Sequence, residues 1–165
     1  MRILGIDPGT VVVGYGVIDS EEEEITFVAC DAVICRQRSP LGERLSYLYN
    51  ELSEVISRHQ PDAVAIEQPF VAKNVRSALA IGKAEAVAML AAANMGIPIY
   101  EYTPAQVKRV VTDYGASSKE QVQEMVRLQL GLSRAPQPID ASDALAVAIC
   151  HLRSVHFKDL LAEGR

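Results

Sequence analysis

Short apolar runs that suit strands alternate along this chain with longer segments of helical period. The first run, residues 3–6, is apolar with a β-branched bias, which is typical of a strand buried on both faces. It ends at one charged residue, Asp7, and Pro8-Gly9 then forces a turn. A second apolar run over residues 11–18 follows at once. The chain is therefore predicted to open with two hairpin-connected strands.

Glycines interrupt the second of these runs at Gly14 and Gly16. A glycine inside a strand often marks a place where another backbone, or a ligand, approaches closely. We therefore expect close packing against this strand.

The remaining elements follow the same two periods. Apolar runs predict further strands at 25–35, 62–67 and 97–102, and the 3.6-residue period predicts helices from near residue 41, at 74–94, 103–112, 118–130 and from 140 to about 155. Thr103 is expected to be an N-cap, with Pro104 at the first helical position. The order predicts one α/β domain over 1–156 and a tail at 157–165. Its mixed five-stranded sheet joins an antiparallel meander to parallel strands flanked by helices.

The helix predicted from Asn74 to Asn94 is apolar nearly all round and rich in alanine. A helix that is apolar on more than one face needs more than one packing partner. Its own sheet supplies one partner, and a second copy of the chain is a candidate for the other.

Composition narrows the class of protein. The chain has 165 residues, enough to bury a full core, and no apolar run approaches the length of a membrane span. Nothing at the N-terminus resembles a signal peptide. Three cysteines at Cys30, Cys35 and Cys150 show no ligand-like spacing, which favours reduced thiols in a cytoplasmic protein.

The net charge of −5 argues against general binding to nucleic acid. The charge is uneven, however: residues 19–62 are strongly acidic, whereas basic residues outnumber acidic ones over residues 70–134. This middle segment is a weak basic patch, compatible with a partner that carries phosphate.

Four carboxylates stand at the ends of predicted core elements: Asp7, Glu67, Asp140 and Asp143. No Lys or Arg lies near Asp7 in the sequence, and converging carboxylates without a basic partner repel one another. Two hard divalent cations would remove that repulsion and support in-line displacement at phosphorus. Each residue also has a structural alternative: Asp7 in an Asx-turn, Glu67 facing solvent, Asp140 as an N-cap and Asp143 as an ordinary first-turn acid.

The chain resembles RuvC-type Holliday junction resolvases, within the RNase H-like nuclease superfamily. The resemblance covers about residues 2–155. It rests on Ile-Leu-Gly-Ile-Asp-Pro-Gly at 3–9, Gly-Tyr-Gly-Val at 14–17, Ala-Ile-Glu-Gln at 65–68, Ala-Lys-Asn at 72–74, Glu-Tyr at 101–102, Gln-Val-Lys at 106–108, Lys119 before Gln-Val-Gln at 121–123, Met-Val-Arg at 125–127 and Asp-Ala-Ser-Asp-Ala-Leu-Ala at 140–146.

This resemblance implies that the four carboxylates are catalytic metal ligands for two Mg²⁺ ions, with Mn²⁺ as an alternative. It also implies a homodimer, formed through the alanine-rich helix, that resolves four-way DNA junctions in recombination and repair. Symmetric paired nicks would leave 5′-phosphate and 3′-hydroxyl ends. The family's branch-migration proteins RuvA and RuvB are candidate partners.

The resemblance also suggests residues that contact DNA. Phe70 would stack on or wedge against an unpaired base at the crossover, although a core position is its alternative. Lys108 and Lys119 match DNA-contacting lysines of the family, and Lys73 and Arg76 are weaker candidates. Because the four carboxylates account for −4 of the net charge of −5, metal loading would make the active face attractive to phosphate.

Three other functions fit part of the pattern. Actin-like ATPases also place an Asp-x-Gly-Thr loop after a strand, as at residues 7–10, but need a second such domain. A second alternative is an RNase H-like nuclease acting on RNA/DNA hybrid or ribosomal RNA. The third is a non-catalytic junction-binding module, against which the four carboxylates argue.

Overall fold

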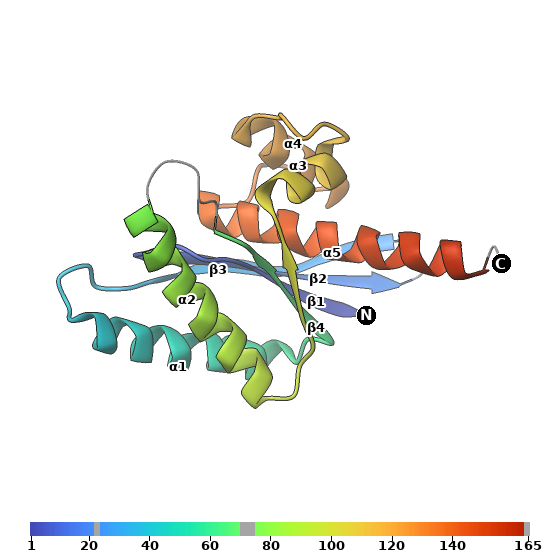
Figure 1. The fold of residues 1–165 in the computed structure, drawn as a ribbon. Helices are drawn as coiled ribbons and strands as arrows, with labels where there is room; N and C mark the ends of the chain where they lie inside the picture. Colours follow the sequence, from blue (N-terminus) through green and yellow to red (C-terminus); the bar gives the residue numbers. More distant parts are fainter. Residues whose placement is uncertain (22–23, 70–74, 164–165) are drawn as a thin grey trace.

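The computed structural model describes residues 1–21, 24–69 and 75–163 (Figure 1). Ten elements follow in chain order: β1 (Arg2–Asp7), β2 (Val12–Glu21), β3 (Glu24–Ile34), α1 (Leu41–His59), β4 (Ala63–Glu67), α2 (Val75–Asn94), β5 (Ile99–Tyr102), α3 (Pro104–Thr112), α4 (Lys119–Gln129) and α5 (Ile139–Glu163).

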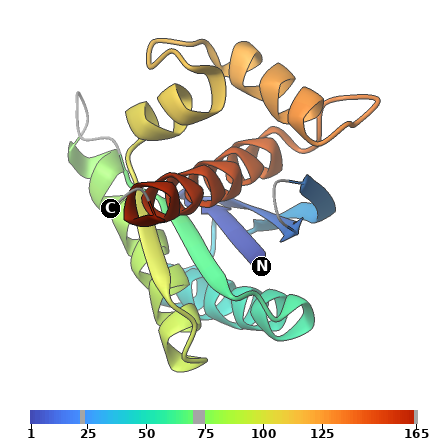
Figure 2. The same ribbon diagram turned by 90° about the vertical axis from the view of Figure 1, so that its right-hand side faces the viewer.

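All five strands form one mixed sheet in the order β3-β2-β1-β4-β5. β1 pairs antiparallel with β2, and β2 with β3, whereas β1–β4 and β4–β5 are parallel. Helices α1 and α2 cover one face, and α5 crosses the other with α3 and α4 outside it (Figures 1 and 2). The predicted meander joined to parallel strands is confirmed.

Alternation along β1 divides the core between the two faces. Leu4 and Ile6 pack with the residues of α1 and α2, whereas Ile3 packs with those of α5. All three side chains are fully buried, so the strand is apolar on both sides, as its sequence predicts. The same alternation places Asp7 on the face that α5 covers.

Strand glycines let α5 lie directly against the sheet. A Cβ at Gly14 would overlap the backbone carbonyl of Asp140, and one at Gly5 would overlap the carbonyl of Ala144. At Gly16 a Cβ would collide with the side chain of Leu145. The close approach expected at Gly14 and Gly16 is thus contact with helix α5, and it fixes where the start of α5 lies.

The predicted N-cap at Thr103 is confirmed, and Ser118 caps the next helix in the same way. Thr103 and Ser118 each accept from the backbone N–H three residues later and form capping boxes with Gln106 and Gln121. The end of the last helix differs from the prediction, because α5 continues to Glu163 where a tail was expected after residue 156. The small-residue helix begins, within the described residues, at Val75.

Helix α2 buries one alanine-rich face and exposes large apolar side chains elsewhere. Ala84, Ala88 and Ala91 are buried, whereas Leu79 is 64% exposed and Leu90 52%. Among the described helices, none combines the length and apolar character that crossing a membrane requires. The three cysteines form no disulfide.

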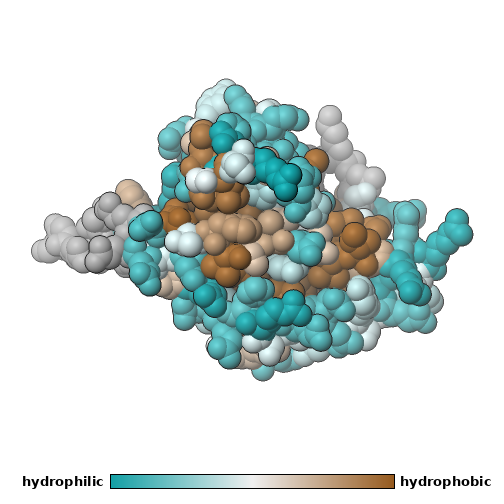
Figure 3. Space-filling view, turned by 180° about the vertical axis from the view of Figure 1, so that it is seen from behind, coloured by the Kyte–Doolittle hydropathy of each residue, from teal (hydrophilic) through white to brown (hydrophobic). Residues whose placement is uncertain are grey.

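The back of the molecule is formed by the edge strand β3 and the connection between α4 and α5, and it carries an apolar band (Figure 3). Phe27, Cys30 and Leu132 line a shallow groove there.

Candidate active site

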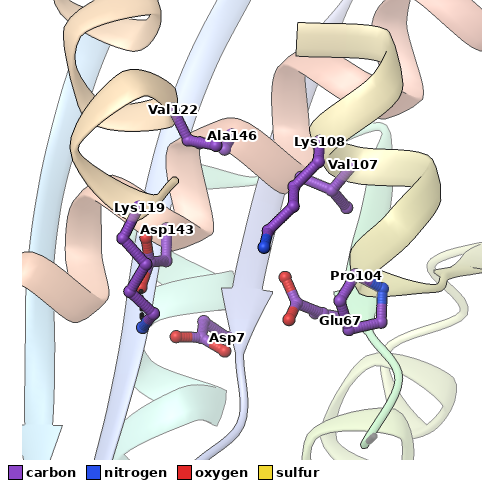
Figure 4. A pocket seen from close by; sticks show the side chains of 9 residues that line it. All are labelled: Asp7, Glu67, Pro104, Val107, Lys108, Lys119, Val122, Asp143 and Ala146. Carbon is purple, nitrogen blue, oxygen red and sulfur yellow. Dashed lines mark hydrogen bonds and ion pairs between the residues drawn. The ribbon is translucent and has the colours of Figure 1, made fainter. Parts of the chain in front are cut away.

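One pocket brings together side chains from β1, β4, α3, α4 and α5 (Figure 4). Its lining residues are Asp7, Glu67, Pro104, Val107, Lys108, Lys119, Val122, Asp143 and Ala146. Three of the four carboxylates singled out in the sequence are among them. The pocket lies where the parallel strands β1 and β4 end, the edge at which α/β sheets place their sites.

Sheet register brings Asp7 and Glu67 to the same level. Ile6 pairs with Ile66 in the parallel β1–β4 ladder, so the next residue of each strand is one of these carboxylates. Asp143 reaches the pocket from α5, whose start is fixed against β2 by the glycine contacts. The three acids are therefore held by rigid elements.

Burial and mutual repulsion change how these acids ionise. Burial raises the pKa of Asp7 to about 8, and the nearby charges of Glu67 and Asp143 add to the effect. Burial, with the charge of Asp143, raises the pKa of Glu67 to about 7. The pocket as it stands favours the protonated forms of Asp7 and Glu67, and a cation placed beside them would reverse that preference.

Lys119 supplies part of such a charge. Its Nζ lies 3.0 Å from Oδ2 of Asp143, whose side chain is only 13% exposed. Its ammonium also lowers the pKa of Asp7 and of Glu67. The expectation that the carboxylates have no basic partner is therefore wrong: the partner comes from the first residue of α4, far away in the sequence.

Lys108 approaches from the other side. It lines the pocket from α3, and Figure 4 shows it near Glu67, whose pKa its charge lowers. The two lysines thus flank the acids from separate helices. The contacts with DNA expected of them stay predictions.

The other sequence-predicted residues are less closely associated with the pocket. Asp140 is near the start of α5 but does not line the pocket, and its charge is the smallest of the named influences on Asp7. Arg76 is exposed on the first turn of α2. Phe70 and Lys73 lie outside the described residues.

Sequence reasoning missed the apolar wall of the pocket. Pro104, Val107, Val122 and Ala146 line it between the charged groups. Apolar lining excludes water and strengthens the electrostatic interactions of the acids. Pro104, Val122 and Ala146 were readable in principle, because each lies three or four residues from Lys108, Lys119 or Asp143 on a predicted helix.

The donor set suits a hard divalent cation, since carboxylate oxygens are the protein ligands that Mg²⁺ prefers. Burial, together with the neighbouring carboxylates, raises the pKa values of Asp7 and Glu67, and a bound cation would favour their ionised forms. In the described parts of the chain, no three Asp, Glu, His or Cys side chains stand close enough together to enclose an ion.

Known proteins share this sequence and fold. The family model for crossover junction endodeoxyribonuclease RuvC matches residues 3–151. A protein of that name from Dehalococcoides mccartyi is 55% identical over 164 residues, covering 99% of this chain and 98% of its own. The structure of Thermus thermophilus RuvC in complex with a Holliday junction substrate superimposes with a TM-score of 0.90 at 34% identity, covering 96% of each chain.

A more distant structure supports the fold alone. The yeast mitochondrial Holliday junction resolvase Ydc2 is 12% identical, with a TM-score of 0.66 over 99% of this chain and 86% of its own. The RNase H-like architecture is thus shared beyond close sequence relatives. With a full-length family match, relatives above half identity and three of the four acids in one pocket, this chain belongs to the RuvC family of crossover junction endodeoxyribonucleases.

Proposed function

We propose that this chain is a structure-selective endodeoxyribonuclease that resolves four-way DNA junctions in recombination and repair in the cytoplasm. The observation that carries the proposal is the convergence of Asp7, Glu67 and Asp143 in one pocket flanked by Lys108 and Lys119. Membership in the RuvC family, one of whose structures holds a Holliday junction substrate, supplies the substrate class.

The acids Asp7, Glu67, Asp140 and Asp143 are proposed to hold two divalent cations, with Mg²⁺ as the ion and Mn²⁺ as an alternative. When bound, such a pair of ions activates a water molecule and stabilises the leaving oxygen of an in-line displacement at phosphorus. The raised pKa values of Asp7 and Glu67 support this role, because buried acids next to other carboxylates ionise more readily beside a bound cation.

The other pocket residues prepare the site for a phosphodiester. Val107, Val122 and Ala146 exclude water on one side. Lys108 and Lys119 bear positive charge at the rim and would contact phosphate oxygens, which position the backbone without reading its sequence. Cleavage at the 3′ oxygen would leave 5′-phosphate and 3′-hydroxyl ends that a ligase can seal.

The active form is proposed to be a homodimer joined through α2. Val75, Leu79 and Leu90 give this helix exposed apolar side chains, which suit a twofold contact between two copies. A twofold dimer matches the symmetry of a four-way junction and would place one nick in each of two opposed strands. Phe70, Lys73 and Arg76 would contact DNA near the crossover, and RuvA and RuvB are proposed partners.

A substrate comparison tests the proposal. Purified protein with Mg²⁺ is offered a mobile four-way junction, a linear duplex of the same sequence and an RNA/DNA hybrid. Cleavage of the junction alone, abolished by EDTA, is expected. Preferential cleavage of the hybrid would agree with the fold but contradict the proposed substrate. Tight binding to the junction without cleavage in any divalent metal would indicate a binding module and not a nuclease.

A further inference from the structure

Three arginines gather at the connection between β3 and α1. Arg36 and Arg38 lie in the connection itself, and Arg44 follows in the first turns of α1. They belong to residues 19–62, which are strongly acidic taken as a whole. The fold places these three arginines apart from the acids at the turn between β2 and β3.

The connection leaves the sheet at the same edge as Asp7. Asp7 pairs with Gly14, and Val12, two residues away, pairs with Ile34 at the end of β3. The backbone N–H of Cys35 then donates to the carbonyl of Val11. Since neighbouring strands lie about 4.8 Å apart, β3 ends roughly 10 Å from β1 across the sheet. Figure 1 shows this connection at the same end of the molecule as the starts of α2 and α5.

Acidic residues of the segment lie at the opposite end. Glu21 pairs with Glu24 where β2 meets β3, and Asp19 forms an ion pair with Arg2 at 2.8 Å. Asp62 accepts from the backbone N–H of Arg2. These acids are therefore remote from the edge that carries the arginines.

Two of the three arginines line an open groove. Arg36 and Arg44 line it together with Ile34, Ser39, Glu43 and Tyr47. Arg44 donates to the carbonyl of Thr10, in the turn that follows Asp7, at 3.3 Å. Its Nε is buried without a hydrogen-bond partner in the described structure. Arg36 and Arg38 are exposed, and their side chains form no ion pair with a described residue.

Guanidinium groups with free donors match phosphate oxygens, which they bind in a planar, often bidentate geometry. Of the six side chains in the groove only Glu43 is acidic, and Arg38 adds positive charge beside it. The turn held by Arg44 connects this groove with the carboxylate pocket. A DNA backbone crossing the end of the sheet would meet the lysines on one side of Asp7 and the arginines on the other.

We propose that Arg36, Arg38 and Arg44 form a second phosphate-binding surface, which holds the junction DNA on the side of the cleavage site opposite Lys108 and Lys119. The inference rests on the proposed function and adds a second region to the DNA-binding face of the protein. It also explains how a chain of net charge −5 presents positive charge to DNA on both sides of its acids.

The test uses Arg36→Gln, Arg38→Gln and the double variant, because neither side chain forms an ion pair that folding would need. Arg58→Gln is the matched control: it removes one exposed arginine from the last turn of α1, at the other end of that helix. Thermal melting of each variant verifies its folding.

Binding to a fluorescent four-way junction is measured in Ca²⁺ over a series of salt concentrations. Each lost phosphate contact lowers the slope of log K against log salt by about 0.9. We expect a slope lower by about 1 for each single variant and about 2 for the double, with weaker binding at low salt, and no change for Arg58→Gln. Wild-type slope and affinity in the double variant would overturn the inference and leave the proposed function intact. Failure of the wild type to bind the junction would overturn both.

Discussion

The Nζ of Lys119 lies 3.0 Å from Oδ2 of Asp143, so α4 provides a positive charge to the acids that end β1 and β4 and begin α5. The lysine side chain is 69% exposed, whereas that of Asp143 is 13% exposed. An exposed ammonium thus balances a largely buried carboxylate. A divalent cation at the proposed metal site would share Asp143 with this ion pair.

Replacing Lys119 with Met is expected to tighten binding of Mn²⁺ in the absence of DNA, because the competing cation is removed. An exposed ion pair contributes up to about 1 kcal/mol, which corresponds to roughly fivefold in affinity. Titration calorimetry measures the change, and Lys119→Arg, which keeps the charge, is the control. Weaker Mn²⁺ binding by the Met variant would show that Lys119 helps the metal and does not compete with it.

The stability of the metal-free protein should fall as pH rises from about 4 to 8. Over this interval the folded chain keeps protons on Asp7 and Glu67, whose pKa values are about 8 and 7, whereas the unfolded chain has lost them near pH 4. Ionising these acids in the folded state therefore costs stability as pH rises, and bound divalent cations should remove the effect.

The variant Asp7→Asn isolates the contribution of Asp7 to the pH dependence of stability, because all other titrating groups are common to both chains. In EDTA, the melting temperature of the variant should exceed that of the wild type at pH 8.5 by about 3 °C or more, the shift for roughly 1 kcal/mol in a protein of this size. The gap should narrow at pH 5. A difference in melting temperature between the two proteins that stays the same from pH 5 to 8.5 would contradict the raised pKa of Asp7.

Gly14→Ala should destabilise the fold, because the added Cβ would overlap the carbonyl of Asp140. Overpacking of this kind costs about 1–3 kcal/mol, measurable by urea unfolding. Gly42→Ala is the matched control: nothing lies within 4 Å of its Cβ position, and Ala in helix α1 should be neutral or stabilising by about 0.5–1 kcal/mol. Equal changes in the free energy of unfolding for Gly14→Ala and Gly42→Ala would argue against close packing of α5 on the sheet.

Leu79→Lys should separate the proposed dimer, because it places a charge in the exposed apolar side of α2. Analytical ultracentrifugation at micromolar concentration is expected to show a dimer for the wild type and a monomer for the variant. Leu128→Lys changes a similarly exposed leucine on α4 and should leave the dimer intact. If Leu79→Lys sediments as a dimer, the contact lies elsewhere.

Much of the fold was predictable because its signals are local. The doubly buried β1, the caps at Thr103 and Ser118 and the period of α1 are each written in short segments. Asp7 and Glu67 were found because each ends a strand, and strand register brings them together. The glycines of β2 indicated close contact before the contacting helix was known.

Other features depend on contacts between distant segments. Lys119 meets Asp143 only because α4 packs beside α5, which no local pattern encodes. The arginines after β3 stand in an acidic stretch of the sequence. Only the pairing of β2 with β3 shows that the acids at the turn of this hairpin lie at the opposite end of the sheet. The last helix extends past its predicted end near residue 155 and continues to Glu163. Apolar residues at Phe157, Leu160 and Leu161 extend the helical period, so this part of the helix was readable from the sequence.

The most direct test of the central claim maps the cuts in a mobile four-way junction with each strand labelled in turn, comparing wild type with Asp7→Asn in Mg²⁺. The account predicts paired nicks at symmetric positions in two opposed strands, resealed by DNA ligase, and activity of the variant no higher than that of the wild type in EDTA. Equal cleavage by Asp7→Asn, or nicks that ligase cannot seal, would contradict it.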